Sequence, residues 1–307
     1  MSQAFELSGV AKRFGTRVAL EAVSVVVPRR SIVGLIGRNG SGKSTLMRLV
    51  AGLYLPDAGE CTTLGRRTAE LGAGELSRLG LVEQHASLIP WMQAGQLLRY
   101  VSSFYPAWDS QLERRLIAEL EVDPTERVSG MSPGNRQKLA LVAATCHHPS
   151  LLLLDEPLSD LDPIARQSVL LMLLDRFSSH EMTIVISSHM LHDIEPVVNR
   201  IVCLDDGMVA ADDDIDSLRE RHEEWIVASP AGRLPARYSE PYVLAAQGDG
   251  YRARLLVRDV GAGEAVAFRA VHDATVEVRP LNLERIFPYL RRDRRSDSAR
   301  RQPEPAA

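Results

Sequence analysis

The stretch Gly37-Arg38-Asn39-Gly40-Ser41-Gly42-Lys43-Ser44-Thr45 decides the fold of this chain. It follows an apolar run at 32–36 that predicts a buried strand, and it leads into a pattern at 44–51 that predicts a helix. Glycines let the backbone turn tightly and direct N–H groups inward, and a helix N-terminus adds the positive end of its dipole. The spacing G-x-x-x-x-G-K-[ST] therefore predicts a nucleotide phosphate loop rather than a chance glycine-rich turn. In such a loop Lys43 faces the β- and γ-phosphates and Ser44 offers a hydroxyl to Mg²⁺.

A second apolar run, at 151–154, ends in two carboxylates, Asp155 and Glu156. In a phosphate-loop fold an aspartate at a strand end completes the Mg²⁺ shell, which makes Asp155 the candidate ligand. Glu156 then lies where a carboxylate could polarise the attacking water. The alternative is a solvated acidic strand end. Four leucines directly before the two acids, in a chain with a phosphate loop, argue against it.

The remaining pattern alternates strands with helices, which predicts an α/β fold with a parallel core sheet. Residues 87–144 are mostly helical in pattern, with breaks at Pro106, Pro124 and Ser129-Gly130, and we interpret them as an inserted helical subdomain. The predicted strands cover 23–27, 32–36, 79–84, 151–154, 183–187 and 201–204, and a further amphipathic helix covers 163–178.

The composition changes after Asp205-Asp206-Gly207. Short strands are expected between Trp225 and Val278, a short helix over 282–290, and disorder in the Arg-, Ser- and Pro-rich end. The predicted domains are therefore a nucleotide-binding domain over 1–211 with its helical subdomain at about 86–146, a β-rich accessory domain over 212–292, and a tail over 293–307.

Charge and composition narrow the choice of partners. The chain has 307 residues and a formal net charge of −4, so it has no global basic field to hold nucleic acid. Its three cysteines lack metal-ligand spacing and are expected to be reduced thiols. We find no signal peptide and no apolar run of the ~20 residues that a membrane helix needs. A membrane-spanning part, if one is needed, is expected in another chain.

With these motifs the chain resembles the nucleotide-binding subunits of ATP-binding cassette (ABC) transporters, over roughly 7–209. The resemblance implies the cassette fold, with an N-terminal antiparallel β-subdomain and a small C-terminal appendage. It also implies that Glu156 is the general base, that His189 contacts the γ-phosphate, and that Gln84 touches Mg²⁺ and the attacking water. The metal ligands would be Ser44, Gln84 and Asp155. The residues implied to bind ATP are Phe14, which stacks on adenine, with Asn39, Gly40, Ser41, Gly42, Lys43, Ser44 and Thr45 of the loop.

The signature segment departs from the family pattern. Where the family has Leu-Ser-Gly-Gly-Gln, this chain has Met131-Ser132-Pro133-Gly134-Asn135. In the family this loop crosses a dimer interface, and Ser132 and Gly134 match the residues that contact the γ-phosphate on the other subunit. Asp162 matches the loop that links the two sites. Pro133 removes one N–H but suits the first position of a helix, so the expectation is a working but weakened composite site.

The function implied by the resemblance is the ATP-hydrolysing subunit of a bacterial ABC transporter. Segments 104–109 and 282–287 resemble stretches of export cassettes, so we expect an exporter. The implied partners are a separate membrane permease, which would dock near Leu88, Ile89 and Trp91, and a second cassette in a homodimer or heterodimer. The expected location is the cytoplasmic face of the cell membrane. The alternatives are a soluble cassette ATPase that acts on ribosomes or DNA, and a regulatory cassette with weak turnover.

Overall fold

The computed structural model describes residues 3–85, 87–179, 182–189, 191–232, 234–279 and 286. The chain divides into two compact units, one up to Asp212 and one from Asp213 onward. Each unit has its own cluster of buried apolar side chains. The expected domain boundary, after residue 211, lies one residue before this division.

A six-stranded sheet in the order β10-β9-β3-β8-β7-β6 forms the centre of the first unit. The strand β3 pairs in parallel with β8 and β9, and β7 pairs in parallel with β6 and β8. Every residue of β3, β7 and β8 is buried, as expected for parallel strands that are covered on both faces. The bounds are β3 (Ile32–Ile36), β6 (Leu79–Val82), β7 (Leu151–Leu154), β8 (Thr183–Ser188), β9 (Arg200–Asp205) and β10 (Met208–Asp214).

Parallel strands bring their carboxyl ends to one edge of the sheet, and this positions the site. Ile36, at the end of β3, pairs with Ser188, and Leu154, at the end of β7, pairs with Ile186. The phosphate loop leaves β3 at this edge and enters α1 (Lys43–Val50). The segments that follow β6, β7 and β8, which carry Gln84, Glu156 and His189, start from the same edge.

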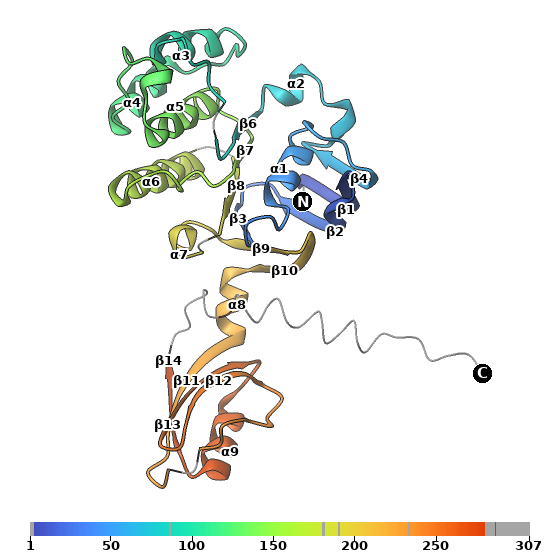
Figure 1. The fold of residues 1–307 in the computed structure, drawn as a ribbon, viewed down its shortest axis with the longest axis vertical. Helices are drawn as coiled ribbons and strands as arrows, with labels where there is room; N and C mark the ends of the chain where they lie inside the picture. Colours follow the sequence, from blue (N-terminus) through green and yellow to red (C-terminus); the bar gives the residue numbers. More distant parts are fainter. Residues whose placement is uncertain are drawn as a thin grey trace, which may run out of the picture. The chain divides into compact units, whose positions relative to one another are not determined.

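An antiparallel sheet in the order β2-β1-β4-β5 stands beside α1 (Figure 1). Its strands are β1 (Gln3–Phe14), β2 (Arg17–Pro28), β4 (Ala58–Thr63) and β5 (Arg66–Arg67). The predicted strand at 23–27 is thus the second half of a strand twice as long, which pairs along β1 instead of joining the parallel sheet. From Val23 onward alternate residues of β2 are buried, and they share one core with Leu46 and Leu49 of α1.

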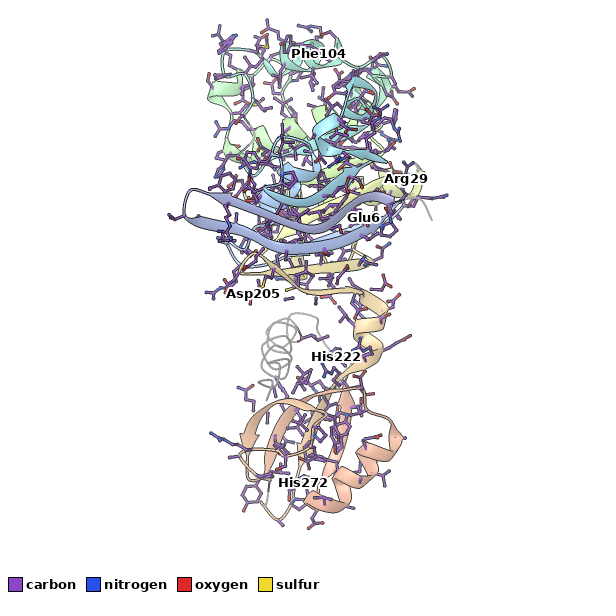
Figure 2. The ribbon with its side chains drawn as sticks, turned by 90° about the vertical axis from the view of Figure 1, so that its right-hand side faces the viewer. Glu6, Arg29, Phe104, Asp205, His222 and His272 are labelled. Carbon is purple, nitrogen blue, oxygen red and sulfur yellow. The ribbon has the colours of Figure 1, made fainter. Side chains whose placement is uncertain are left out.

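The helical subdomain consists of α3 (Ala94–Ser102), α4 (Ser110–Glu119) and α5 (Pro133–Thr145), which lie together and apart from the antiparallel sheet (Figure 1). A short 3₁₀ helix, η2 (Val128–Gly130), precedes α5. The aromatic ring of Phe104 lies on its outer surface (Figure 2). The first unit is completed by η1 (Thr68–Glu70), α2 (Ala73–Leu76), α6 (Pro163–Ser179) and α7 (Leu191–Ile194).

The second unit is a four-stranded antiparallel sheet in the order β12-β13-β11-β14 with one covering helix. Trp225 and Phe268 form its core with edge-on rings 5.5 Å apart. His222 begins β11 and His272 ends α9 (Figure 2). The bounds are α8 (Ile215–Arg221), β11 (His222–Ala228), β12 (Val243–Asp249), β13 (Arg252–Arg258), α9 (Ala262–His272) and β14 (Thr275–Arg279).

The short strands expected between Trp225 and Val278 are present as β11, β12, β13 and β14. Residues 262–272, where no helix was expected, form α9. Glu264 accepts a hydrogen bond from the backbone N–H of Gly261 at 2.9 Å, which caps the helix start, and the alanine-rich sequence favours the helix. The helix expected over 282–290 and the tail expected over 293–307 lie outside the described residues, except for Ile286.

Among the described residues, no helix has both the length and the apolar character needed to cross a membrane.

Candidate nucleotide-binding site

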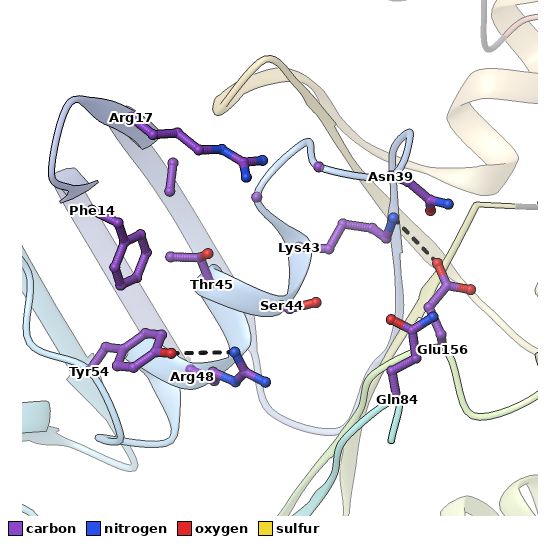
Figure 3. A pocket seen from close by; sticks show the side chains of 13 residues that line it. Phe14, Arg17, Asn39, Lys43, Ser44, Thr45, Arg48, Tyr54, Gln84 and Glu156 are labelled. Carbon is purple, nitrogen blue, oxygen red and sulfur yellow. Dashed lines mark hydrogen bonds and ion pairs between the residues drawn. The ribbon is translucent and has the colours of Figure 1, made fainter. Parts of the chain in front are cut away.

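A cavity of about 540 Å³ lies between the antiparallel sheet, the phosphate loop and the ends of two parallel strands (Figure 3). Nine of its lining residues are ones that the sequence singled out for nucleotide chemistry: Phe14, Asn39, Gly40, Gly42, Lys43, Ser44, Thr45, Gln84 and Glu156. They come from four separate parts of the chain, so only the fold brings them together. The other lining residues are Arg17, Ala19, Arg48 and Tyr54.

The phosphate loop takes a shape that only glycine tolerates at two positions. Gly40 and Gly42 have φ angles of 84° and 106°, in the region that side chains disfavour. A Cβ on Gly42 would also lie 2.7 Å from the backbone oxygen of Ala19. Gly42 directly precedes the first residue of α1, so the N-terminus of this helix, with its free backbone N–H groups, lies at the cavity.

Lys43 is the buried cation of the cavity, with 5% of its side chain exposed. Its Nζ donates to the backbone oxygen of Gly37 at 2.7 Å and lies 3.3 Å from Glu156 Oε1 (Figure 3). The ion pair joins the cation of the phosphate loop directly to the carboxylate that follows β7. Ser41 is buried beneath the loop instead of lining the cavity, and its Oγ has no hydrogen-bond partner among the described residues.

Behind Glu156 the acidic strand end is held by a buried serine. Ser187 Oγ donates to Asp155 Oδ1 at 2.6 Å, and the backbone N–H of Glu156 donates to Ser187 Oγ at 2.8 Å. Glu156 Oε2 lies 2.9 Å from His189 Nδ1. Glu156 has a φ of 49°, which is uncommon for a residue with a side chain and which surrounding contacts must hold in place. The hydrogen bonds therefore fix one carboxylate toward the cavity and beside the histidine.

The residues expected to hold Mg²⁺ offer the oxygen donors that this ion prefers. Ser44 and Gln84 line the cavity, while Asp155 is buried next to Glu156. Among the described residues, no group of three His, Cys, Asp or Glu side chains could hold a metal by itself. Mg²⁺ usually takes one or two carboxylates together with waters and substrate phosphates. The set therefore fits Mg²⁺ that arrives with a nucleotide.

Four lining residues were missed by the sequence analysis: Arg17, Ala19, Arg48 and Tyr54. Tyr54 stacks edge-on against Phe14 with ring centroids 5.3 Å apart, and its hydroxyl accepts from Arg48 Nη1 at 3.3 Å (Figure 3). Arg48 also bonds Glu83 at 2.8 Å, and the hydrogen bond to Glu83 raises the pKa of its guanidinium. Arg17 lies against Gly40 of the loop. No motif spacing marks these positions, because β2 and the end of α1 reach the cavity only in the folded chain.

Ser132, Gly134 and Asp162 do not line the cavity. Ser132 caps α5, since its Oγ accepts from the backbone N–H of Asn135 at 3.1 Å, and Pro133 is the first residue of that helix, as its missing N–H allows. Asp162 accepts from the backbone N–H groups of Ile164 and Ala165, and the bond to Ala165 contributes most to lowering its pKa below the usual range.

Gly134 is required by packing within the chain. A Cβ there would lie 2.7 Å from the backbone oxygen of Asp160, so the start of α5 packs directly on the loop after Glu156. Within this chain, therefore, the signature residues cap a helix and pack against a loop, outside the nucleotide cavity.

A smaller groove of about 240 Å³ lies between β6 and the helical subdomain. Of the residues expected to meet a membrane partner, Leu88 lines it, whereas Trp91 is exposed outside it. The groove also contains His147 and Tyr105, whose rings stack 4.1 Å apart, and burial lowers the pKa of His147. Ile89, the third residue expected there, does not line the groove.

Comparison with known proteins identifies the family. The profile described as "ABC transporter" matches residues 20–159. The chain is 36% identical over 220 residues to the aliphatic sulfonates import ATP-binding protein SsuB of Burkholderia ambifaria, covering 71% of this chain and 66% of that protein's length. It is 30% identical over 224 residues to the ABC transporter ATP-binding protein YtrB of Bacillus subtilis, covering 71% and 74%.

A solved structure supports the same assignment. An ATP-binding cassette, described as a dimer in a post-hydrolysis state bound to ADP and Pi, superposes with a TM-score of 0.61 and 25% identity. The match covers 69% of this chain and 98% of that one. The predicted α/β phosphate-loop fold is thereby confirmed, and the chain belongs to the ABC transporter family, whose ATP-binding cassette ATPase domain it carries.

Proposed function

We propose that this chain is the subunit that hydrolyses MgATP in an ABC transporter. The observation that carries the proposal is the placement of Glu156. Its carboxylate lies 3.3 Å from Lys43 of the phosphate loop and 2.9 Å from His189, at the edge of the cavity. A carboxylate so placed can accept a proton from a water that attacks the γ-phosphate.

The other residues of the site would bind the adenine, the phosphates and Mg²⁺. Phe14 offers an aromatic face to the adenine, as its place beside Tyr54 supports. Lys43 and the N–H groups of the loop would bind the phosphates, and Lys43 would exchange its bond to the Gly37 carbonyl for phosphate oxygens. Ser44, Gln84 and Asp155 would hold Mg²⁺, which neutralises charge as it develops on the phosphates. His189 would hold Glu156 in position and contact the γ-phosphate.

We also propose that two cassettes complete each site together. Ser132 lies at the start of α5, outside the cavity of its own chain. Pro133 has no N–H and the Asn135 N–H is bonded to Ser132 Oγ, so the backbone N–H of Gly134 is the donor of this helix start that would serve a phosphate. A second chain that presents Ser132 and Gly134 to the bound nucleotide would close the open side of the cavity. Asp162, at the start of α6, would lie at the junction. The cassette solved as a dimer supports this arrangement.

The membrane partner would dock at the groove between β6 and α5. The groove is lined mainly by apolar side chains and lies next to Gln84, so an occupant could sense nucleotide through that residue. This places the chain, in our proposal, on the cytoplasmic side of a membrane, bound to a separate permease. The proposal carries no direction of transport. The expectation of an exporter finds no support among the relatives, since the Burkholderia protein is named for import.

The proposal is tested by substituting the carboxylate. Glu156→Gln keeps the size and a hydrogen-bonding oxygen but removes the base, so ATP should bind and remain uncleaved. On size exclusion with MgATP, the variant should elute as a dimer, while wild type returns to monomer as ATP is consumed. Glu60→Gln, at a half-exposed ion pair with Arg67, is the matched control and should behave like wild type. A Glu156→Gln variant that stays monomeric in saturating MgATP would count against the composite site.

A further inference from the structure

Arg166, near the start of α6, holds the loop that follows Glu156. Its Nε–H is shared between two backbone carbonyls, at 3.1 Å from the oxygen of Leu158 and 3.0 Å from that of Leu161. Both carbonyls belong to the segment 157–161 that begins directly after Glu156. The guanidinium therefore fixes the path of the backbone on one side of the catalytic carboxylate.

The same guanidinium is bonded to the segment that follows His189. Arg166 Nη1 lies 3.3 Å from Asp193 Oδ2 and 3.4 Å from Oδ1. Asp193 is on α7, four residues after His189, and its carboxylate is 14% exposed. One side chain thus spans from the loop after Glu156 to the helix after His189.

The pair Glu156–His189 and the pair Arg166–Asp193 line the same small cavity. A cavity of about 110 Å³ is lined by Glu156, His189, Arg166 and Asp193, with Ser159 and the serines that end β8 among its other walls. Ser159 ties the loop back to Glu156, because both its N–H and its hydroxyl bond the Glu156 carbonyl, at 3.2 Å and 3.0 Å. A shift of the loop would therefore be transmitted to the backbone of Glu156.

The loop has a third contact, at the signature helix. The backbone oxygen of Asp160 lies so close to Gly134 that a Cβ there would approach it to 2.7 Å. A displacement of segment 157–161 would then also move the start of α5. Segment 157–161 is therefore linked to Glu156, to the helix after His189 and to the start of the signature helix α5.

We propose that Arg166 is a positioning residue that sets Glu156 relative to His189, by tying the loop after one to the helix after the other. This inference rests on the proposed role of Glu156 in hydrolysis. Arginine suits the task because its planar fork can bond two carbonyls and a carboxylate at once, which a lysine ammonium on a flexible stem cannot reproduce. Misplacement of a reacting group by about 1 Å can slow a reaction about 100-fold.

The test is the rate of ATP hydrolysis by the full chain at saturating MgATP, with ATP affinity measured separately by equilibrium binding. Arg166→Met should lower the hydrolysis rate about 10- to 100-fold and leave ATP affinity within about twofold, because Arg166 lies outside the nucleotide cavity. Asp193→Ala removes the same link from its other end and should give a similar loss. The double variant should be no slower than the single ones, and Arg166→Lys should recover part of the rate.

Arg200→Met is the matched control. Arg200 forms an ion pair of similar exposure with Asp212, at 2.7 Å, but touches neither the loop nor α7. It should lower the melting temperature without slowing hydrolysis. The inference is overturned if Arg166→Met and Asp193→Ala slow hydrolysis no more than Arg200→Met, or if they weaken ATP binding as much as they slow turnover. Failure of the proposed function would look different, because Glu156→Gln would then hydrolyse ATP as fast as wild type.

Discussion

Ser187→Ala should be among the most damaging single-atom deletions in the first unit. Its hydroxyl is buried and makes two hydrogen bonds, a charged one to Asp155 at 2.6 Å and one from the Glu156 N–H at 2.8 Å. A hydrogen bond to a charged group contributes about 1.5–3 kcal/mol and a neutral one about 0.5–1.5 kcal/mol. The free energy of unfolding of this unit should therefore fall by about 2–4 kcal/mol.

The assay is scanning calorimetry of the full chain, followed at the transition of the first unit. For a unit of this size about 1 kcal/mol corresponds to 2–4 °C, so the transition should fall by roughly 5–15 °C. Ser31→Ala is the control, because Ser31 is also buried but makes a single neutral bond, to the carbonyl of Pro28 at 2.8 Å. It should lower the transition by only about 1–6 °C. Equal shifts for the two variants would refute the claim that Ser187 holds the acidic strand end.

Further predictions concern the signature, the aromatic wall and a helix cap. Gly134→Ala should destabilise the first unit by about 1–3 kcal/mol and abolish the ATP-dependent dimer, because its Cβ would lie 2.7 Å from the backbone oxygen of Asp160. Chemical unfolding measures the loss of stability and size exclusion measures the dimer; an unchanged dimer would contradict the prediction. Phe14→Ala should weaken ATP binding about 2- to 10-fold with the hydrolysis rate at saturation unchanged, whereas Tyr54→Phe, which keeps the ring contact, should bind ATP normally in the same titration. Asp109 caps α4 by accepting from Leu112 and Gln111, bonds that lower its pKa below the usual 3.8. Because that pKa is depressed, the contribution of the cap is fully present above about pH 4 and is lost as the pH falls through the lowered pKa. Asp109→Ala should therefore cost about 1 kcal/mol at neutral pH and progressively less in thermal melts as the pH is lowered below 3.8; a cost that does not change with pH would rule out the ionised cap.

Much of the site could be predicted because its chemistry is local in sequence. The phosphate loop needs glycines and Lys43 at fixed spacing, and Asp155 and Glu156 follow directly on a buried strand. Parallel strands then bring these ends together at one edge of the sheet, as the registers of β3, β7 and β8 show. The motif spacing therefore predicted which residues form the site and that they lie together at one edge of the parallel sheet.

What the sequence did not predict depends on contacts between distant segments. Arg17 and Tyr54 reach the cavity from β2 and from beyond α1, and neither position carries a motif. The helix α9 was missed because its residues do not form a clear apolar stripe, and only Phe268 is buried. The capping pair of Gly261 and Glu264 was the signal that could have identified it. The role of Arg166 is likewise visible only where the loop and α7 meet.

The central claim, that Glu156 is the base of an ATP-hydrolysing site, is tested most directly by phosphate release. The full chain is mixed with saturating MgATP, and free phosphate is followed for wild type and Glu156→Gln, with ATP binding measured in parallel. We predict that the variant binds ATP as wild type does and releases phosphate at least about 100-fold more slowly, as expected when a general base is removed. Equal rates of phosphate release from the two proteins would contradict the account.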